Sequence, residues 1–390
     1  MVERLGNWKS GELGDFVTFK RGFDLPQQKR ENGQVPIFSS SGITGTHSTA
    51  MVKAPGVITG RYGTIGEVFY AAEDFWPLNT TLFVENYHGN DAKFIYYFLK
   101  TLEWSKFTSA SAVPGINRNT VHKEIVSLPD IETQKRIAST LSMLDEKIKT
   151  NTEINDNLQQ QAQALFKKWF VDNPDAISWK EGTFSDLIEK TISGDWGKDS
   201  PSGNNTEMVY CIRGADIPEV RAGNKGKMPT RYILPKNYAA KQLVDGDIVV
   251  EISGGSPTQS TGRAAAVSDT LLARYDKGMV CTNFCKALKP RAGYSMYVYY
   301  YWQYLYDRNI FFSYENGTTG IKNLDINGFI ETEPIVIAPE DLVEKFDAVC
   351  QTVFSKIYAN GMENEQLALV RDTILPKLMS GEIDVSAVQL

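Results

Sequence analysis

Apolar residues recur at steps of four and three through a long polar stretch near the middle of the chain. The stretch begins after Asp130 and contains no glycine or proline up to Asp172. Asn151 and Asn155 stand at its centre. Apolar residues spaced in this way form the seam of a coiled-coil helix, so the pattern predicts one long helix over residues 131–172. The seam residues are Ile137, Leu141, Leu144, Ile148, Leu158, Ala162, Leu165 and Trp169.

A second stretch, which begins after Pro339, repeats this pattern. The residues that match Ile137, Leu144, Asn151, Leu158 and Leu165 are Phe346, Val353, Asn360, Leu367 and Ile374. Every apolar position matches an apolar one, and asparagine matches asparagine. Both helices need a partner for their seams, so we expect an antiparallel pair in which Asn151 faces Asn360. A buried asparagine pair would fix the helix register, and the alternative is that both asparagines are solvated.

The rest of the chain is also built twice. The segment Trp8-Lys9-Ser10-Gly11 lines up with Trp179-Lys180-Glu181-Gly182, and an aromatic run at 94–98 matches one at 297–301. A repeat of this length indicates two homologous domains. In each domain, short apolar runs alternate with glycine loops and one aromatic helix, which is typical of a mixed α/β fold. We expect the aromatic stripes to pack in the domain cores.

The predicted fold class is therefore α+β, with two homologous mixed α/β domains separated by two long helices that pair as an antiparallel coiled coil. With 390 residues, the chain is longer than a single core usually supports. The predicted boundaries are 1–130 for the first domain, 131–172 for the central helix, 173–335 for the second domain and 336–390 for the C-terminal helix.

Composition narrows the class of protein further. Hydrophobic residues make up 42% of the chain, which is ample for folded cores and excludes a mostly disordered chain. No stretch approaches the roughly 20 apolar residues of a membrane span, and the first residues contain no apolar signal core. The four cysteines all fall in the second half and are interpreted as reduced thiols. We expect a cytoplasmic protein.

The net charge of −6 is unevenly distributed. Residues 1–130 carry 13 basic and 13 acidic side chains, and residues 180–335 carry 18 of each. The C-terminal segment 336–390 has only 4 basic side chains against 9 acidic ones. A neutral domain still binds DNA when its basic side chains gather on one face. The acidic helices, by contrast, are not expected to touch phosphate.

A family resemblance is carried by the stretches Val57–Val84, Leu144–Ile148, Asn155–Leu158, Ala164–Phe170 and Ile374–Ile383. These stretches resemble the specificity subunits of type I restriction–modification systems. Together they indicate a resemblance over essentially the whole chain, including the order domain, helix, domain, helix. The second domain matches mainly at its start and at its glycine loops, and it lacks a clear counterpart to Trp76-Pro77-Leu78-Asn79.

The resemblance implies a subunit that reads double-stranded DNA and catalyses nothing itself. Each domain would be a target-recognition domain for one half of a bipartite target. The helices would set the spacing of the two halves and dock two methyltransferase subunits, and two restriction subunits would complete the complex. This chain would bind no cofactor, because S-adenosylmethionine, ATP and Mg²⁺ would belong to the partner subunits.

The sequence motifs for catalysis are incomplete in this chain. Asp130 with Asp145 and Lys147 matches a nuclease motif literally, but the last two lie on the predicted helix, about 20 Å from Asp130. A nuclease needs its carboxylates together around Mg²⁺. Cys281 and Cys285 lack the spacing and the histidines of a zinc site, so we expect no metal site. A phosphate-binding glycine loop is also missing from the sequence.

DNA contacts are expected from loop side chains that reach base edges and phosphates close to glycines. Arg61 and Arg263 are the leading candidates, because their glycine loops recur in both domains. The alternative function is a non-catalytic coiled-coil scaffold that does not bind DNA. The full set of candidates is Lys20, Arg21, Arg61, Tyr62, Thr64, Asn117 and Arg118 in the first domain, and Arg213, Ser256, Thr258, Gln259, Arg263, Lys322 and Asn323 in the second.

Overall fold

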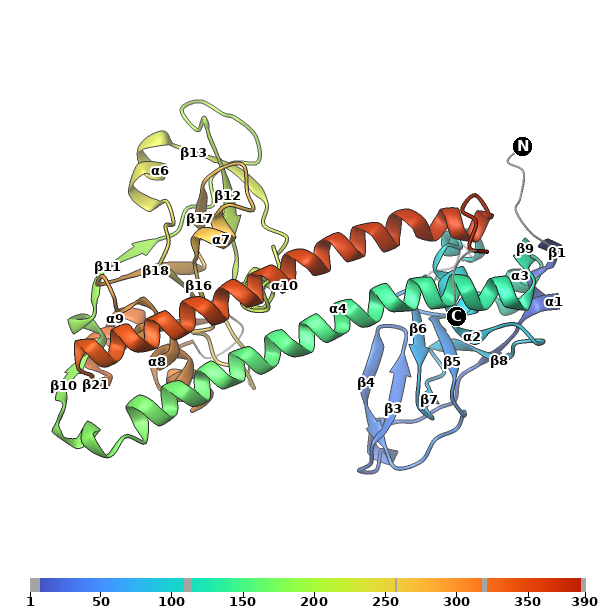
Figure 1. Cartoon of the computed structure of the whole chain (residues 1–390), viewed down its shortest axis with the longest axis horizontal. Helices are drawn as coiled ribbons and strands as arrows, with labels where there is room; N and C mark the ends of the chain where they lie inside the picture. The colour runs from blue at the N-terminus through green and yellow to red at the C-terminus, as the bar shows by residue number, and fades with distance from the viewer. Residues whose placement is uncertain (1–7, 109–113, 257, 318–320, 387–390) are drawn as a thin grey trace. The chain divides into compact units, whose positions relative to one another are not determined.

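The structure is a computed structural model that describes residues 8–108, 114–256, 258–317 and 321–386. Two long helices, α4 (Ile131–Phe166) and α10 (Glu340–Ser380), accompany two mixed α/β domains (Figure 1). Helix α4 continues into a π-helical turn at Lys167–Val171. The predicted fold class and the two long helices are confirmed. Within the described residues, every helix is too short or too polar to cross a membrane.

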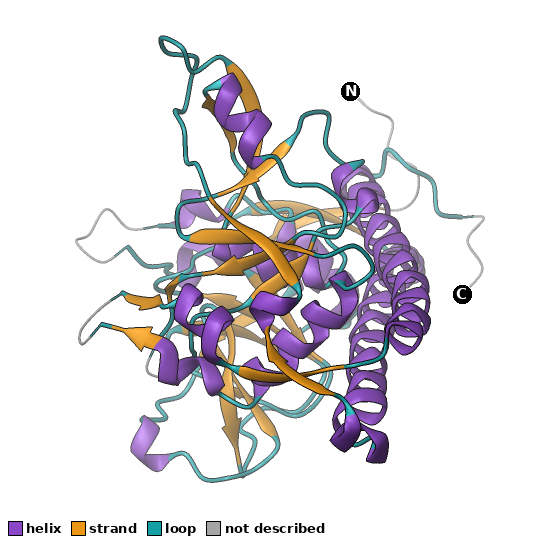
Figure 2. Cartoon of the chain, turned by 90° about the vertical axis from the view of Figure 1, so that its left-hand side faces the viewer, coloured by secondary structure: helices purple, strands orange, loops and turns teal. Residues whose placement is uncertain are grey.

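The chain divides into two compact units. Residues 1–146 and 367–390 form the first unit, and residues 147–366 form the second. Each unit therefore contains one α/β domain and a part of each long helix. Strands and short helices are interleaved in the domains (Figure 2). The predicted division into recognition domains and spacer helices is a division by function, and it stays a prediction.

A four-stranded antiparallel sheet recurs with the same strand order in both units. In each sheet, one edge strand is the second strand of the domain. The other edge strand belongs to an antiparallel pair formed by two consecutive strands of this sheet. This shared topology is what the internal sequence repeat predicts. The order is β2 (Thr18–Arg21), β8 (Thr81–Asn86), β5 (Gly56–Gly60) and β6 (Val68–Ala71) in the first unit, and β11 (Ile188–Ser193), β18 (Cys285–Pro290), β14 (Ile248–Glu251) and β16 (Ala264–Ala266) in the second.

A three-stranded sheet is also repeated, with a central strand that pairs antiparallel on one side and parallel on the other. The first and last strands of each domain then pair with each other, so each domain closes directly before its long helix. The three-stranded sheets are β4 (Gly42–His47), β3 (Val35–Ser39) and β7 (Trp76–Pro77), and β13 (Thr230–Ile233), β12 (Glu207–Ile212) and β17 (Met279–Cys281). The closing pairs are β1 (Trp8–Glu12) with β9 (Ile125–Pro129), and β10 (Lys180–Thr183) with β21 (Pro334–Ile337).

Short helices cover these sheets. The second unit also has a small extra sheet of β15 (Ser253–Gly254), β20 (Lys322–Leu324) and β19 (Glu315–Asn316). The short α-helices are α1 (Leu13–Phe16), α2 (Ala92–Lys100) and α3 (Arg118–His122) in the first unit, and α5 (Ile217–Arg221), α6 (Pro235–Lys241), α7 (Asp269–Leu272), α8 (Ser295–Asp307) and α9 (Ile326–Thr332) in the second.

The two aromatic stripes lie in the cores, as expected. On α2, Phe94 and Tyr97 are fully buried, and on α8, Tyr297 and Trp302 are fully buried. Helix α2 begins after Asp91, whose side chain caps it by accepting a hydrogen bond of 2.7 Å from the backbone N–H of Phe94. Large aromatic side chains supply much of the apolar area that a core buries.

The turns that precede β8 and β18 are equivalent in the two domains, although the sequence Trp76–Asn79 has no clear counterpart in the second domain. The N–H of Leu78 donates to Phe38 O at 2.8 Å, and the N–H of Thr282 donates to Ile212 O at 3.0 Å. Each turn closes three residues later, with a 2.9 Å hydrogen bond in both cases. The backbone pairing is conserved although Asn79 and Asn283 are the only matching side chains, so sequence comparison alone could not reveal it.

The long helices pair through asparagines, but with a register one turn away from the predicted one. The Asn151 amide donates to Asn364 Oδ1 at 2.9 Å, and the Asn360 amide donates to Asn155 Oδ1 at 2.8 Å. The prediction that Asn151 faces Asn360 was therefore wrong. In the observed register, four asparagines pair two by two, so that their buried amides find partners. All four are buried rather than solvated.

The same asparagine layer holds a loop of the second domain. The Asn155 amide also donates to Ala222 O and to Ile357 O, both at 3.0 Å. Gly361 on α10 permits this contact, because a Cβ atom there would lie 1.9 Å from Gly223 O. Gly223 has a φ of +85°, which glycine adopts at little cost. Backbone therefore lies against backbone where the loop meets the helix pair.

In the first unit the helices are joined by charge. Arg371 Nη1 donates to Asp145 Oδ1 at 2.7 Å, and the hydroxyl of the buried Tyr97 donates to Asp145 Oδ2 at 2.5 Å. Burial and this hydrogen bond raise the pKa of Tyr97. Asp145, which belongs to the literal nuclease motif, is thus tied into the packing of α2 and both long helices.

Candidate nucleic-acid interface

Arg61 and Tyr62 begin the loop that directly follows β5. The loop is anchored by backbone hydrogen bonds from Arg61 N to Thr80 O at 2.8 Å and from Ile116 N to Arg61 O at 3.0 Å. The Arg61 guanidinium carbon lies 4.4 Å from the centre of the Tyr62 ring. Among the described residues, Arg61 has no salt-bridge partner within 4.0 Å. Its charge therefore remains available for a ligand.

Two further candidates of the first domain lie near the end of β5, from which the Arg61 loop leaves the sheet. Arg21 is exposed and pairs with Leu82 in the ladder, and Leu82 pairs in turn with Thr59, one residue before the end of β5. Thr64 is exposed on the loop, and its carbonyl would lie 1.9 Å from a Cβ on Gly60. Glycine at position 60 therefore lets the loop fold back.

The remaining candidates of the first domain have structural partners. Asn117 caps α3 by accepting from Asn119 N at 3.0 Å, and Arg118 donates to Phe19 O at 3.5 Å. Lys20 forms a 2.5 Å ion pair with Glu85, in which both side chains are more than two-fifths exposed. The Asn117 and Arg118 segment is brought to Arg61 by the hydrogen bond of the preceding residue, Ile116.

Arginine candidates in the second domain are bound to buried carboxylates. Arg263 donates to both oxygens of Glu251, at 2.8 and 2.7 Å. Arg213 donates to both oxygens of Asp216, at 2.9 and 3.0 Å. These hydrogen bonds raise the pKa of both arginines. Burial raises the pKa of Asp216, but the bonds from Arg213 and from backbone N–H groups outweigh it and leave that pKa below its usual value. Both arginines therefore organise loops.

Lys322 is held in the same way, by a 2.7 Å ion pair with the buried side chain of Glu315. Asn323 is exposed and pairs with Ser253 across the small extra sheet. The sheet thus brings Asn323 to the loop between β14 and β16. That loop contains a turn in which Ser256 Oγ accepts from Thr258 N at 3.3 Å and from Gln259 N at 3.0 Å, leaving both of these side chains exposed.

The structure therefore gathers the candidates around one connection that is equivalent in the two domains, between β5 and β6 and between β14 and β16. The two leading arginines do not occupy equivalent positions within it. Arg61 starts the loop after β5, whereas Arg263 ends the loop before β16. Of these two arginines, Arg61 has no ion-pair partner among the described residues, whereas Arg263 is paired with Glu251.

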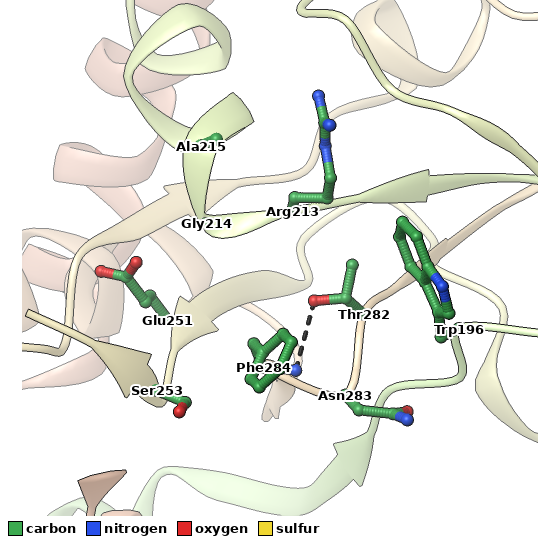
Figure 3. A pocket seen from close by; sticks show the side chains of 9 residues that line it. All are labelled: Trp196, Arg213, Gly214, Ala215, Glu251, Ser253, Thr282, Asn283 and Phe284. Carbon is green, nitrogen blue, oxygen red and sulfur yellow. Dashed lines mark hydrogen bonds between the residues drawn. The ribbon is translucent and has the colours of Figure 1, made fainter. Parts of the chain in front are cut away.

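A pocket of about 520 Å³ opens at this connection in the second domain (Figure 3). Its wall includes three residues that the sequence did not single out, namely Trp196, Asn283 and Phe284. Trp196 and Phe284 are 39% and 60% exposed. The sequence offered one indication of this wall, the apolar Phe284 next to Asn283, which matches Asn79 of the first domain. The two turns can be recognised as equivalent only in the structure.

The four cysteines are buried and form no disulfide bonds. Burial raises the pKa of Cys211 and of Cys285 to about 12 in each case, which keeps both thiols protonated near neutral pH. Over the described ranges of the chain, no three side chains among histidine, cysteine, aspartate and glutamate are grouped so that they could hold a metal ion.

Comparisons with known proteins agree with the fold. Residues 6–160 match the type I restriction modification DNA specificity domain. The chain is 26% identical over 334 residues to the type I restriction enzyme MjaIX specificity subunit of Methanocaldococcus jannaschii, covering 79% of this chain and 74% of that protein. It is 25% identical to the HindI specificity subunit of Haemophilus influenzae, covering 73% and 75% of the two chains.

The fold has a solved counterpart as well. The crystal structure of the type I restriction–modification S subunit from M. genitalium superposes with a TM-score of 0.58 at 16% identity, covering 97% of both chains. The DNA specificity domain matches the first α/β domain, and the second domain repeats its sheet topology. Over most of its length the chain is similar to type I restriction–modification specificity subunits, and its first domain carries the DNA specificity domain of that family.

Proposed function

We propose that this chain reads the DNA target of a type I restriction–modification complex, with each recognition domain reading one half of a bipartite sequence. The observation that carries the proposal is the repeated sheet topology, which places a loop cluster at the same sheet connection in both domains. The side chains on these loops differ between the domains, with Arg61 free in one and Arg263 paired in the other. Equivalent scaffolds with different loops suit two different half-sites.

The long helices would set the distance between the half-sites and dock two methyltransferase subunits. Two restriction subunits would join the same complex. Paired helices suit a spacer because the interlocked asparagines oppose sliding, and polar seam residues specify register. The two homologous domains would provide similar surfaces for two copies of one partner.

In this proposal the chain performs no chemistry. Methylation and ATP-dependent cleavage would reside in the partner subunits, together with S-adenosylmethionine, ATP and Mg²⁺. Asp145 supports this view, because its carboxylate is engaged by Arg371 and Tyr97. The complex would act in the cytoplasm, where its DNA substrate lies.

A methyl-transfer assay tests this division of labour. The purified chain, incubated with labelled S-adenosylmethionine and DNA, should transfer no methyl groups, whereas the chain with its methyltransferase partner should label a bipartite target. DNA affinity of the complex should fall steeply with salt, because phosphate contacts release counterions. Transfer by the chain alone would contradict the proposal. A complex whose DNA affinity is absent at low salt would favour the scaffold alternative.

A further inference from the structure

The pocket beside Trp196 and Phe284 lies within the proposed reading surface of the second domain. Its walls come from the ends of several strands, with Arg213 following β12, Ser253 following β14 and the turn 282–284 following β17 (Figure 3). The equivalent strand ends of the first domain carry Arg61 and Thr80. The pocket thus occupies the place at which the first domain presents its free arginine.

The turn that carries Asn283 and Phe284 is held firmly from both sides. The N–H of Phe284 donates to Thr282 Oγ1 at 3.2 Å, and its carbonyl accepts from Ile252 N at 2.9 Å. The next residue, Cys285, closes the turn onto Thr282 O at 2.9 Å. With 60% of Phe284 exposed, a large apolar side chain is presented to solvent on a backbone that has little freedom to withdraw it.

The opposite wall is also fixed. The Trp196 ring lies 4.1 Å from the guanidinium carbon of Arg231, which is 6% exposed and donates to Trp196 O at 2.8 Å. The aromatic ring is therefore stacked on a buried cation, and Trp196 is still 39% exposed and lines the pocket. Preorganised aromatic rings of this kind are stacking platforms for planar ligands.

The charges around the pocket are already paired. Glu251 is neutralised by Arg263, and Arg213 is neutralised by Asp216. A phosphate would find neither guanidinium unpaired there. The aromatic walls and the exposed amide of Asn283 instead match an uncharged planar ring that carries hydrogen-bonding groups at its edge. In DNA this ligand is a nucleobase.

We propose that this pocket is a base-specificity pocket of the second domain, in which Phe284 and Trp196 contact the ring or methyl group of one half-site base and Asn283 hydrogen-bonds its edge. This inference rests on the proposed function, since it requires that the second domain reads DNA. It assigns specificity to side chains outside the arginine pairs, and it gives those pairs a positioning role.

The test uses the complete methylating complex and a library of random DNA sequences. Methylated sequences are recovered for the wild type, for Phe284→Ala and for Asn283→Ala. Each variant should lose preference at one or two positions of one half-site, on the order of ten- to a hundred-fold, while the other half-site stays unchanged. Phe284→Tyr, which keeps the ring, should retain most of the preference.

Controls separate the possible failures. Val244→Ala changes an exposed apolar residue of the same domain outside the pocket and should preserve both half-sites. If the wild-type complex selects no bipartite sequence, the proposed function itself fails. If it does so and folded Phe284→Ala and Asn283→Ala keep the full preference, only the pocket proposal is overturned.

Discussion

At the scale of single residues, the second domain depends on two arginine–carboxylate pairs with bidentate geometry. Glu251 and Asp216 are 5% and 2% exposed, so neither carboxylate is well solvated without its arginine. Such ion pairs add little to the stability of the fold compared with apolar side chains in the same place. The loss of one partner, however, leaves the other charge buried and unpaired, which is strongly destabilising. The pairs therefore hold the loops around the pocket in place.

Arg263→Gln should destabilise the protein by about 3 kcal/mol, because it leaves Glu251 as an unpaired buried charge. The double variant with Glu251→Gln should recover part of that loss. The measurement is urea unfolding of the full chain. Arg61→Gln is the matched control and should change the unfolding free energy by less than about 0.5 kcal/mol, because Arg61 is unpaired in the described structure. Equal losses for the two single variants would contradict this account.

Single residues also show which features of the site could be predicted from the sequence and which could not. Loops rich in glycine and arginine were correctly located, because glycines mark turns between apolar runs. The partners of Arg213 and Arg263 could not be predicted, since a carboxylate three or twelve positions away is visible in sequence but its burial is not. Phe284 was missed for the opposite reason, because an apolar residue is normally assigned to a core.

At the scale of elements, the helix pair and the second domain meet in one polar layer. The heptad pattern predicted both helices and the importance of their asparagines. It gave the wrong register because Asn364, which lies outside the aligned seam, was not considered as the partner of Asn151. The contact of Asn155 with Ala222 O joins residues far apart in the sequence, and no periodic pattern could reveal it.

Gly361→Ala provides the sharpest test of this layer. In an ordinary helix the change would stabilise by about 1 kcal/mol. Here the new Cβ would meet Gly223 O, so we expect a net destabilisation of about 1 to 3 kcal/mol, comparable with overpacking a core. Thermal unfolding measures it, with the exposed Ser355→Ala on the same helix as the control. A more stable Gly361→Ala protein would mean that the loop does not rest on the helix.

At the scale of the whole molecule, the proposal makes the helix pair a ruler for the DNA target. Four residues added after Glu146 and four after Gln366 would extend both helices where the two units meet in sequence. Each insertion adds about 6 Å of helix, so the preferred spacer should grow by one or two base pairs while both half-sites stay unchanged. Selection from a random-spacer library measures this length.

An insertion in α4 alone serves as the comparison. It would shift Asp145 by about one turn relative to Arg371 and should lower stability as well as spacing precision. An unchanged spacer in the double insertion would mean that the helices do not set the distance between half-sites.

The central claim is that the two domains read DNA independently, and exchanging one domain tests it most directly. Residues 180–335 would be replaced by the matching domain of a relative whose target is known, and methylated sequences would be selected from random DNA with the methyltransferase partner present. The account predicts that one half-site changes to that of the relative while the other half-site is retained. If both half-sites change together, or neither does, the two domains do not read separate halves of the target.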